Sequence, residues 1–373
     1  MKMQLPLLEF VDSLFFNKDL TGSIVIACQH IMEPQMIFFR KLVNCGVKNE
    51  NFFVLGKCYS TNKNIFNELK MDGFKVHEDS AKFDSYVPFD KQWSASVAKF
   101  VSFVEKSTNI KNFSRIIVID DGGFLIEEIQ KRGFDIGKIV AVEQTSSGYA
   151  KLRDSDFKFP IINVARSNAK LLHESPYVAE LFIKNLNIFL TEIKKAPKST
   201  LIIGNGAVGG AISNALSKLM QVKHIDIEKE KSDFELNNLH NVISNFDLIV
   251  GATGKEILGL KDLKFIKKGS ILASVSSSDR EFSAAEIRRE FQKTNNPHHH
   301  FVSNGIVLLN AGFPVTFKGA RCEIPLEKIQ LTMALLYAGI LQGIKNINKV
   351  GIVELNKNIQ KKIVFELYNL KKV

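Results

Sequence analysis

The segment LIIGNGAVGGAISNAL places three glycines in the spacing G-x-G-x-x-G, directly after an apolar run and at the start of a helical pattern. At such a junction Gly204 allows a tight turn, Gly206 lets the backbone approach a pyrophosphate, and Gly209 lets helix and strand pack closely. The N-terminus of the following helix supplies free N–H groups for phosphates. We therefore expect a dinucleotide site whose loop consists of Gly204, Asn205, Gly206, Ala207, Val208 and Gly209.

An acidic residue after the next apolar segment indicates which dinucleotide is bound. Asp226 lies 22 residues after Gly204, where a carboxylate accepts hydrogen bonds from both ribose hydroxyls and repels a 2′-phosphate. NAD is therefore favoured over NADP, and Glu228 is a nearby alternative acid. The segment FDLIVGATG is typical of a further strand, and we expect three residues at its end to close over the cofactor: Ala252, Thr253 and Gly254.

The elements that must position these loops alternate between short apolar runs and helical patterns. The first half gives, in order, strand 23–29, helix 33–46, strand 51–57, helix 94–106, strand 114–123, helix 124–133 and strand 138–144. Buried strands that alternate with helices predict a parallel sheet. A long helical pattern at 175–195 then precedes a second alternation, and an apolar helix is expected at 325–345.

This restart predicts an α/β fold with two doubly wound parallel-sheet domains, in which a Rossmann-type NAD domain is inserted after a split substrate domain. The expected boundaries are 1–175 for the substrate domain, 176–197 for a connecting helix, 198–322 for the NAD-binding domain and 323–373 for a returning helix and C-terminal segment. Such an insertion favours an active site between the domains, which closing of the domains would gate.

Composition excludes several classes of protein. A chain of 373 residues suits two domains, and no apolar run of 18 residues is present to form a spanning helix. Glu9 and Asp12 interrupt the apolar start, unlike a signal peptide, so we expect a cytoplasmic protein. The net charge of +11 is spread along the chain without an aromatic–basic stripe, which argues against a nucleic-acid partner.

Neither the cysteines nor the histidine run indicates a functional metal site. The run His298–His300 lies in a polar loop, and no cysteine pair has the C-x-x-C spacing. Scattered cysteines in a chain of this size are typical of reduced core residues. The four are Cys28, Cys45, Cys58 and Cys322.

Several further segments, in the same order along the chain, resemble those of the S-adenosylhomocysteine hydrolase family. The most specific are IDDGG, which resembles the family's L-D-D-G-G, and INVARSNAK, which resembles I-N-V-N-D-S-V-T-K. The resemblance covers most of the first 320 residues. The matching segments are HIM (30–32), CYSTN (58–62), IDDGG (119–123), EQTSSG (143–148), INVARSNAK (162–170), GNGAVG (204–209) and LLNAG (308–312).

The resemblance implies a tightly held NAD, oxidation of a ribose 3′-hydroxyl, elimination of a thiol, addition of water and re-reduction. It implies that Lys170 takes the hydroxyl proton, and an amine beside a cationic nicotinamide ring gives up its own proton more easily. Glu174 stands where the family has an aspartate, and Asn310 matches an asparagine near the nicotinamide. Asp121 and His30 match groups that act at the 4′ and 5′ positions. The implied catalytic residues are thus Lys170, Asp121, His30 and Glu174.

The chain departs from the family where the substrate is recognised. Gln144 replaces a glutamate, so this position can bind ribose hydroxyls but cannot act as a base. Ser277 replaces a histidine, FPVTFKG (313–319) lacks another, and Met32 and Pro34 replace residues that contact adenine. The tail YNLKKV lacks the ending that reaches a neighbouring subunit's NAD. The expected substrate-binding residues are Gln144, Thr145, Ser60, Thr61 and Met32.

The oxidation residues are retained while the adenine and leaving-group residues change. This pattern favours an NAD-dependent enzyme that oxidises a hydroxyl of a nucleoside or related sugar or thioether. Two alternatives remain open: a genuine S-adenosylhomocysteine hydrolase, and a non-catalytic NAD-bound regulatory protein. A 2-hydroxy-acid dehydrogenase is disfavoured because Phe313–Pro314 stands where a His-Pro pair would be needed. We expect a small-molecule substrate, no membrane partner and a homo-oligomer.

Overall fold

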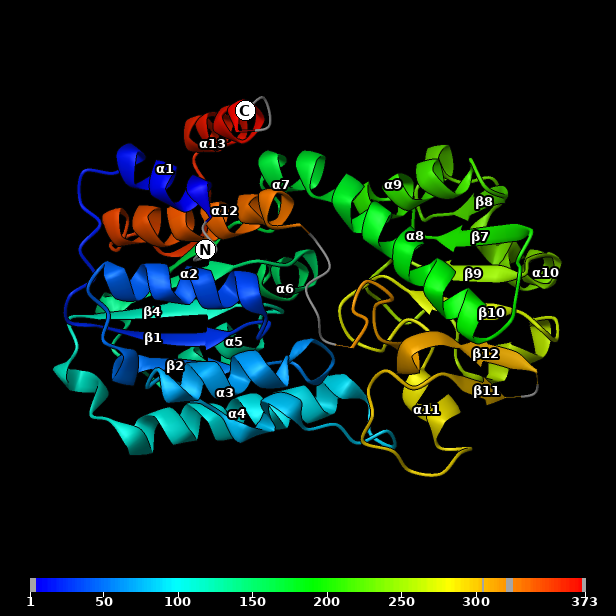
Figure 1. Ribbon diagram of the computed structural model, residues 1–373, viewed down its shortest axis with the longest axis horizontal. Coiled ribbons are helices and arrows are strands. Elements are labelled where there is room, and N and C mark those ends of the chain that lie inside the picture. Colours follow the sequence, from blue (N-terminus) through cyan, green and yellow to red (C-terminus); the bar gives the residue numbers. More distant parts are fainter. Residues whose placement is uncertain (1–4, 304, 320–324, 371–373) are drawn as a thin grey trace. The chain divides into compact units, whose positions relative to one another are not determined.

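The first sheet has seven parallel strands, and its strand order reverses direction once (Figure 1). The computed structural model describes residues 5–303, 305–319 and 325–370. Across the sheet, the strands are β3 (Lys75–Val76), β2 (Phe52–Leu55), β1 (Ser23–Cys28), β4 (Arg115–Asp120), β5 (Ile139–Glu143), β6 (Pro160–Asn163) and β13 (Gly351–Glu354). From β1 the chain proceeds to β2 on one side, whereas β4 leads to β5 on the other. The reversal therefore lies between β1 and β4.

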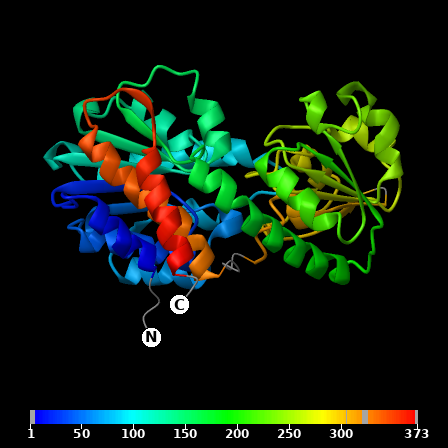
Figure 2. The same cartoon turned by 90° about the horizontal axis from the view of Figure 1, so that it is seen from above.

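Helices cover both faces of this sheet because alternate strand residues point to opposite faces. Val25 and Ala27 join one core with α1 (Pro6–Leu14), α2 (Glu33–Asn44), α12 (Leu326–Lys345) and α13 (Lys357–Asn369). Figure 2 shows α12 in orange and α13 in red crossing over this side. Phe53 faces the other way and contacts Phe103 of α4 (Phe89–Ser107), with ring centroids 5.8 Å apart.

A glycine lets α12 approach the sheet closely. A Cβ atom at Gly343 would lie 2.3 Å from Cγ1 of Val140 on β5. The remaining helices of this part of the chain are α3 (Lys63–Met71), α5 (Phe124–Lys131), α6 (Ser146–Leu152) and α7 (Asn168–His173). Each of them follows a strand and so begins near the edge of the sheet where the strands end.

The second sheet has six strands, and five of them are parallel. Across this sheet, the strands are β8 (Gln221–Ile225), β7 (Ser199–Ile203), β9 (Leu248–Gly251), β10 (Ile271–Ser274), β12 (Ile306–Leu308) and the antiparallel edge strand β11 (Phe301–Ser303). Its helices are α8 (Ser175–Glu192), α9 (Ala207–Leu216), α10 (Leu239–Val242) and α11 (Ala284–Arg288). The two parallel-sheet α/β units confirm the predicted fold class.

Contacts along the chain define the membership of each unit. The first unit comprises Met1–Ala81, Ser94–Glu174 and Ala320–Val373, and the second comprises Lys82–Trp93 and Ser175–Gly319. The expected connecting helix is α8, whose apolar residues pack in the core of the second unit. The expected boundary at 322/323, and Cys322, lie outside the described residues. The C-terminal segment supplies a seventh strand, β13, which the sequence analysis did not anticipate.

A buried ion pair fixes the segment Lys82–Trp93 to the second unit. Arg288 is fully buried and pairs with Asp279 over 2.6 Å. Its Nε donates to the backbone oxygen of Ser85 (2.8 Å), and Asp279 accepts from the backbone N–H of Phe89 (3.1 Å). As a result α4 begins at Phe89, five residues before the expected start, and its first turn is grouped with the second unit.

Two features of the described residues bear on the sequence expectations. None of the described helices combines the length and the apolar character that a bilayer crossing requires. Cys28 and Cys58 are buried, and Cys45 is partly buried.

Candidate functional site

The candidate site of the first unit lies where the strand order reverses. In open parallel α/β sheets, ligands bind outside the carboxyl ends of the strands at this switch point. His30 follows β1 by two residues, and Asp121 follows β4 directly. The expected residues His30 and Asp121 are therefore carried by the two loops that flank the switch point.

Hydrogen bonds and ion pairs join the loops after β1, β2, β4 and β5 at this edge. His30 Nε2 lies 3.1 Å from Asp121 Oδ2, and His30 Nδ1 lies 2.6 Å from the hydroxyl of Ser60. The side-chain amide of Gln144 donates to Asp121 Oδ2 over 3.2 Å. The ammonium of Lys57 pairs with Asp121 Oδ1. The structure thus brings together four expected site residues and adds Lys57, which the sequence analysis did not single out.

The charges of this cluster fix the ionisation of Asp121. Its side chain is 1 % exposed, and that of Lys57 is 3 % exposed. Burial raises the pKa of Asp121, but Lys57 and then His30 outweigh burial and hold this pKa well below its usual range. Burial likewise lowers the pKa of Lys57, but Asp121 outweighs it and raises that pKa. Asp121 is therefore a carboxylate, and Lys57 is an ammonium.

A second carboxylate, Glu143, shapes the loops that carry Asp121 and Thr145. It accepts hydrogen bonds from the backbone N–H groups of Gly122 (3.2 Å), Gly123 (3.0 Å) and Thr145 (2.7 Å). It also accepts from the Thr145 hydroxyl over 2.7 Å, so this expected substrate-binding hydroxyl is engaged within the protein. Glu143 thus holds two loops in place. The sequence analysis predicted only that it belongs to a strand.

Asp120 lies beside Glu143 on the adjacent strand and differs from it in protonation state. The two residues are register partners on β4 and β5. Asp120 accepts from the backbone N–H of Ile126 (2.9 Å), and burial raises its pKa to about 7. Burial also raises the pKa of Glu143. Because Glu143 has four donors, we assign the proton that such a buried pair holds to Asp120.

Lys170 and Glu174 form a separate pair on and just after α7, beyond the carboxyl end of β6. Lys170 Nζ lies 3.1 Å from Glu174 Oε2, and the side chains are 13 % and 23 % exposed. The hydroxyl of Thr332 on α12 donates to the same carboxylate oxygen over 3.0 Å. β6 is the second strand from β4, so this pair occupies the same edge of the sheet as Asp121.

The two other expected substrate residues lie beside the cluster in buried positions. The hydroxyl of Thr61 donates to the backbone oxygens of Lys57 (2.9 Å) and Ser80 (2.8 Å), which fixes the loop after β2. Met32 is 4 % exposed and immediately precedes α2. Thr61 therefore has a clear structural role, and its binding role stays a prediction.

The glycine loop of the second unit has the spacing constraints of a dinucleotide site. Gly204 has a φ of +99°, and a Cβ atom there would lie 2.8 Å from the backbone of Ala252. A Cβ atom at Gly209 would lie 1.9 Å from the oxygen of Gly204. A Cβ atom at Gly206 would meet nothing within 4 Å, so packing inside the protein does not require this glycine. The open space beside Gly206 fits the close approach of a pyrophosphate.

Asp226 lies against this loop, at the carboxyl end of β8. Its Oδ2 accepts from the backbone N–H of Asn205 over 2.6 Å, and its Oδ1 accepts from the backbone N–H of Glu228 over 3.0 Å. The side chain of Asn205 donates to the backbone oxygen of Lys231 (2.9 Å). A carboxylate oxygen accepts more than one hydrogen bond, so Asp226 retains acceptor capacity for ribose hydroxyls.

The loop after β9 is organised by a buried glutamate, Glu281. Its carboxylate accepts from the backbone N–H groups of Thr253 (2.9 Å) and Gly254 (2.7 Å) and from the Thr253 hydroxyl (3.0 Å). β7 and β9 flank the switch point of this sheet, so Ala252 and its neighbours lie across that point from the glycine loop. The sequence analysis missed Glu281, and no local pattern around it could have indicated this role.

Asn310 is held firmly inside its own loop after β12. Its amide donates to the backbone oxygens of Pro314 (2.9 Å) and Phe317 (3.0 Å), and its Oδ1 lies 3.0 Å from His298 Nδ1. Its φ is +51°, a left-handed conformation that asparagine tolerates better than most residues. The role near a nicotinamide stays a prediction for Asn310.

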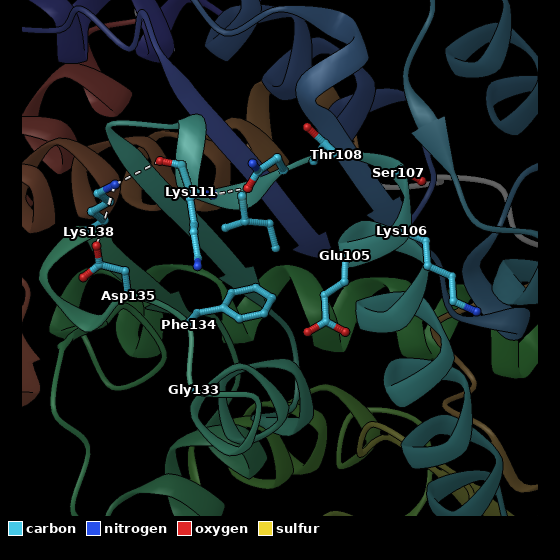
Figure 3. A pocket seen from close by; sticks show the side chains of 11 residues that line it. Glu105, Lys106, Ser107, Thr108, Lys111, Gly133, Phe134, Asp135 and Lys138 are labelled. Atoms are coloured by element: carbon cyan, nitrogen blue, oxygen red, sulfur yellow. Dashed lines mark hydrogen bonds and ion pairs between the residues drawn. The ribbon is translucent and has the colours of Figure 1, made fainter.

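An open hollow lies at the opposite end of the first sheet (Figure 3). It measures about 850 Å³ and is lined by 105–111, Gly133–Asp135 and Lys138, which precede β4 and β5. These segments lie at the amino ends of the strands, away from the switch point. Among the residues that the structure describes, no group of three His, Cys, Asp or Glu residues could hold a metal ion.

The sequence position of Lys57 is compatible with membership of the site. It follows the apolar strand FFVL and a single glycine, so it belongs to the same carboxyl edge as His30 and Asp121. The sequence analysis placed Lys57 within the predicted strand 51–57. Only the ion pair with Asp121, which the sequence does not show, distinguishes it from other lysines.

Comparisons with known proteins give one extensive and one partial similarity. No protein-family model matches the chain. An uncharacterized protein of Mycobacterium tuberculosis is 35% identical over 341 residues, which cover 89% of this chain and 66% of that relative. The chain thus spans just under two thirds of that relative's length. The adenosylhomocysteinase of Thermoplasma acidophilum is 25% identical over 193 residues, covering 48% of this chain and 47% of the enzyme.

Among solved structures, a dipicolinate synthase polypeptide of Bacillus halodurans resembles the chain with a TM-score of 0.41. The sequences are 11% identical, and the match covers 88% of this chain and 98% of that polypeptide. The fold assignment given above rests on the strand order and not on this likeness.

Proposed function

We propose that the chain binds NAD in its second unit and oxidises a hydroxyl group on a nucleoside, or on a related sugar or thioether. The observation that carries this proposal is the meeting of His30, Gln144 and Asp121, which come from loops after three different strands, at the switch point of the first sheet. The partial similarity to an adenosylhomocysteinase supports the same class of reaction.

On the cofactor side, the backbone N–H groups of the loop Gly204–Gly209 and the N-terminus of α9 would hold the phosphates. Asp226 would accept hydrogen bonds from the ribose hydroxyls, and Thr253 and Gly254 would close over the cofactor. NAD, when bound, accepts the hydride that is removed from the oxidised carbon. The open space beside Gly206 fits the pyrophosphate of either dinucleotide, and the carboxylate of Asp226 fits NAD better than NADP.

On the substrate side, Lys170 would take the proton of the hydroxyl that is oxidised, and Glu174 would hold the lysine side chain in place. His30 and Asp121 would act on the neighbouring carbon atoms. Gln144 would orient the sugar, and the buried hydroxyl of Ser60 would hold the ring of His30. An amide at 144 binds hydroxyls but exchanges no proton, which favours a substrate or a net reaction different from that of adenosylhomocysteinase.

The test supplies NAD to the purified protein, adds adenosine, S-adenosylhomocysteine and a panel of nucleosides, and follows the absorbance of reduced nicotinamide. Reduction with a vicinal-diol substrate supports the proposal. Thiol release from S-adenosylhomocysteine would instead indicate a genuine hydrolase. NAD binding without reduction by any vicinal diol would favour a non-catalytic regulatory protein. Mass spectrometry of small molecules released from the denatured protein would identify a retained cofactor or ligand.

We also propose that the chain forms a homo-oligomer, as the resemblance implies. Light scattering of the purified protein over a range of concentrations measures this property independently of activity.

A further inference from the structure

The ion pair between Lys57 and Asp121 is the most deeply buried charge pair at the candidate site of the first unit. The two side chains are 3 % and 1 % exposed. Removing either charge from such a pair is strongly unfavourable, because the other remains in a poorly solvated environment. Lys57 therefore requires Asp121 to remain a carboxylate.

An ionised Asp121 dictates which atoms of His30 carry hydrogen. A carboxylate only accepts hydrogen bonds, so His30 Nε2, at 3.1 Å, must donate to Asp121. A neutral ring with hydrogen on Nε2 has a bare Nδ1, which accepts from the hydroxyl of Ser60 over 2.6 Å. The ammonium of Lys57 thus determines the tautomer of His30 through Asp121.

We propose that Lys57 is a positioning residue that keeps Asp121 a carboxylate, so that Asp121 holds His30 as the neutral tautomer with hydrogen on Nε2 and with Nδ1 facing Ser60. His30 is the more exposed partner of its pair with Asp121, at 13 % against 1 %. The inference deepens the proposed function and rests on it for the identity of the ligand, a hydroxyl-bearing sugar.

Two other arrangements fit the contacts less well. If Asp121 itself took the proton, the buried charge of Lys57 would lose this anion. If Ser60 were a nucleophile in a Ser–His–Asp relay, it would have to meet a substrate, but Ser60 is fully buried. A neutral His30 that is oriented by an ionised Asp121 is consistent with both observations.

The experiment records ring-nitrogen NMR spectra of histidine-labelled full-length protein at neutral pH, with the His30 signals assigned from a His30→Ala sample. It needs neither a substrate nor NAD. In the wild type we expect hydrogen on Nε2 and a bare Nδ1. Lys57→Arg keeps the charge and should leave this pattern unchanged.

Lys57→Met should change the pattern. Without the cation, the Asp121–His30 pair binds one more proton. If His30 takes this proton, both ring nitrogens carry hydrogen. If Asp121 takes it, the carboxyl group donates to Nε2 and the ring carries its own hydrogen on Nδ1, so Nδ1 is protonated in both cases. Lys41→Met is the matched control, because Lys41 is also a buried lysine that is paired with Asp12 (2.6 Å) in the same unit, away from His30.

Two results would overturn the proposal: a protonated Nδ1 in the wild type, or a bare Nδ1 in Lys57→Met. The wild-type spectrum decides the first point even if Lys57→Met does not fold. If nucleosides fail to reduce NAD while the spectra behave as expected, then the proposed function fails and the positioning role of Lys57 stands.

Discussion

A Cβ atom on Gly209 would lie 1.9 Å from the carbonyl oxygen of Gly204, whereas a Cβ atom on Gly206 would meet nothing within 4 Å. The two glycines of this loop therefore have different roles. Gly209 is needed by the protein itself, and the absence of a side chain at Gly206 is useful only to something that binds there.

This difference predicts opposite effects for two alanine substitutions. Gly209→Ala should destabilise the protein by about 1–3 kcal/mol or more, because backbone must shift. Gly206→Ala should leave the melting temperature unchanged and weaken NAD binding at least about tenfold, or ~1.4 kcal/mol. Thermal unfolding and calorimetric titration with NAD measure the two effects. Wild-type NAD affinity in Gly206→Ala would contradict the assignment of the cofactor site.

Asp226 should set the preference between the two nicotinamide dinucleotides. Asp226→Asn removes the charge that repels a 2′-phosphate, so the affinity for NADP relative to NAD should rise about tenfold. Asp233→Asn is the control, because Asp233 lies nearby but pairs with Lys223 over 2.9 Å. Titration of each variant with both dinucleotides gives the ratio. An unchanged ratio in Asp226→Asn would point to Glu228 as the discriminating acid.

Lys170 should affect the chemical step and not the binding of the cofactor. We expect Lys170→Met to lower the rate of nucleoside-dependent NAD reduction by about 100- to 10,000-fold, the usual contribution of a proton-transfer group. NAD affinity should stay within about twofold of wild type. Lys151→Met, which removes an ion pair with Glu127 (3.0 Å) in the same unit, is the matched control. Equal loss of activity in both variants would argue for a merely structural effect.

The buried acid Asp120 should make the protein less stable as the pH rises. Its folded pKa of about 7 lies above the unfolded value of about 3.9. Between these values the folded state keeps a proton that the unfolded state releases, so the free energy of unfolding falls as the pH rises from about 4 to about 7. Glu143 acts in the same direction.

Asp120→Asn should therefore show a smaller loss of stability than the wild type over this pH window, as urea unfolding at several pH values would measure. Asp121 does not interfere, because its lowered pKa costs stability only as the pH falls below about 4. A steeper pH dependence in Asp120→Asn would contradict the assignment of the raised pKa.

Breaking the ion pair of Arg288 and Asp279 should be costly. Arg288→Met leaves the buried carboxylate of Asp279 without its cation and should cost about 3–5 kcal/mol. Adding Asp279→Asn should recover part of this loss, since the two effects are not additive for contacting residues. Denaturant unfolding of both single variants and of the double variant measures the coupling. Strict additivity would show that the pair does not act as a unit.

Local patterns were enough to predict the two parallel-sheet units and the glycine loop. Apolar runs of strand length, helical patterns and the G-x-G-x-x-G spacing are all short-range features, and most predicted elements agree with the structure to within a few residues. The family resemblance selected His30, Asp121, Ser60 and Gln144, which the structure joins by hydrogen bonds.

Long-range partners could not be predicted in this way. Lys57 contacts Asp121, 64 positions away, and Arg288 contacts Ser85, 203 positions away. Neither residue type is unusual in a chain with 50 lysines and arginines, so only the folded arrangement reveals their roles. The same holds for β13, whose four residues show no pattern beyond a short apolar pair.

The anchoring of residues 82–93 by Arg288 restricts how this protein can be divided. A shortened gene that encodes only 175–319 would produce an isolated second unit in which Arg288 lacks the backbone oxygen of Ser85 and Asp279 lacks the backbone N–H of Phe89. To produce the second unit alone, residues 82–93 must be supplied as well, either fused through a linker or added in trans.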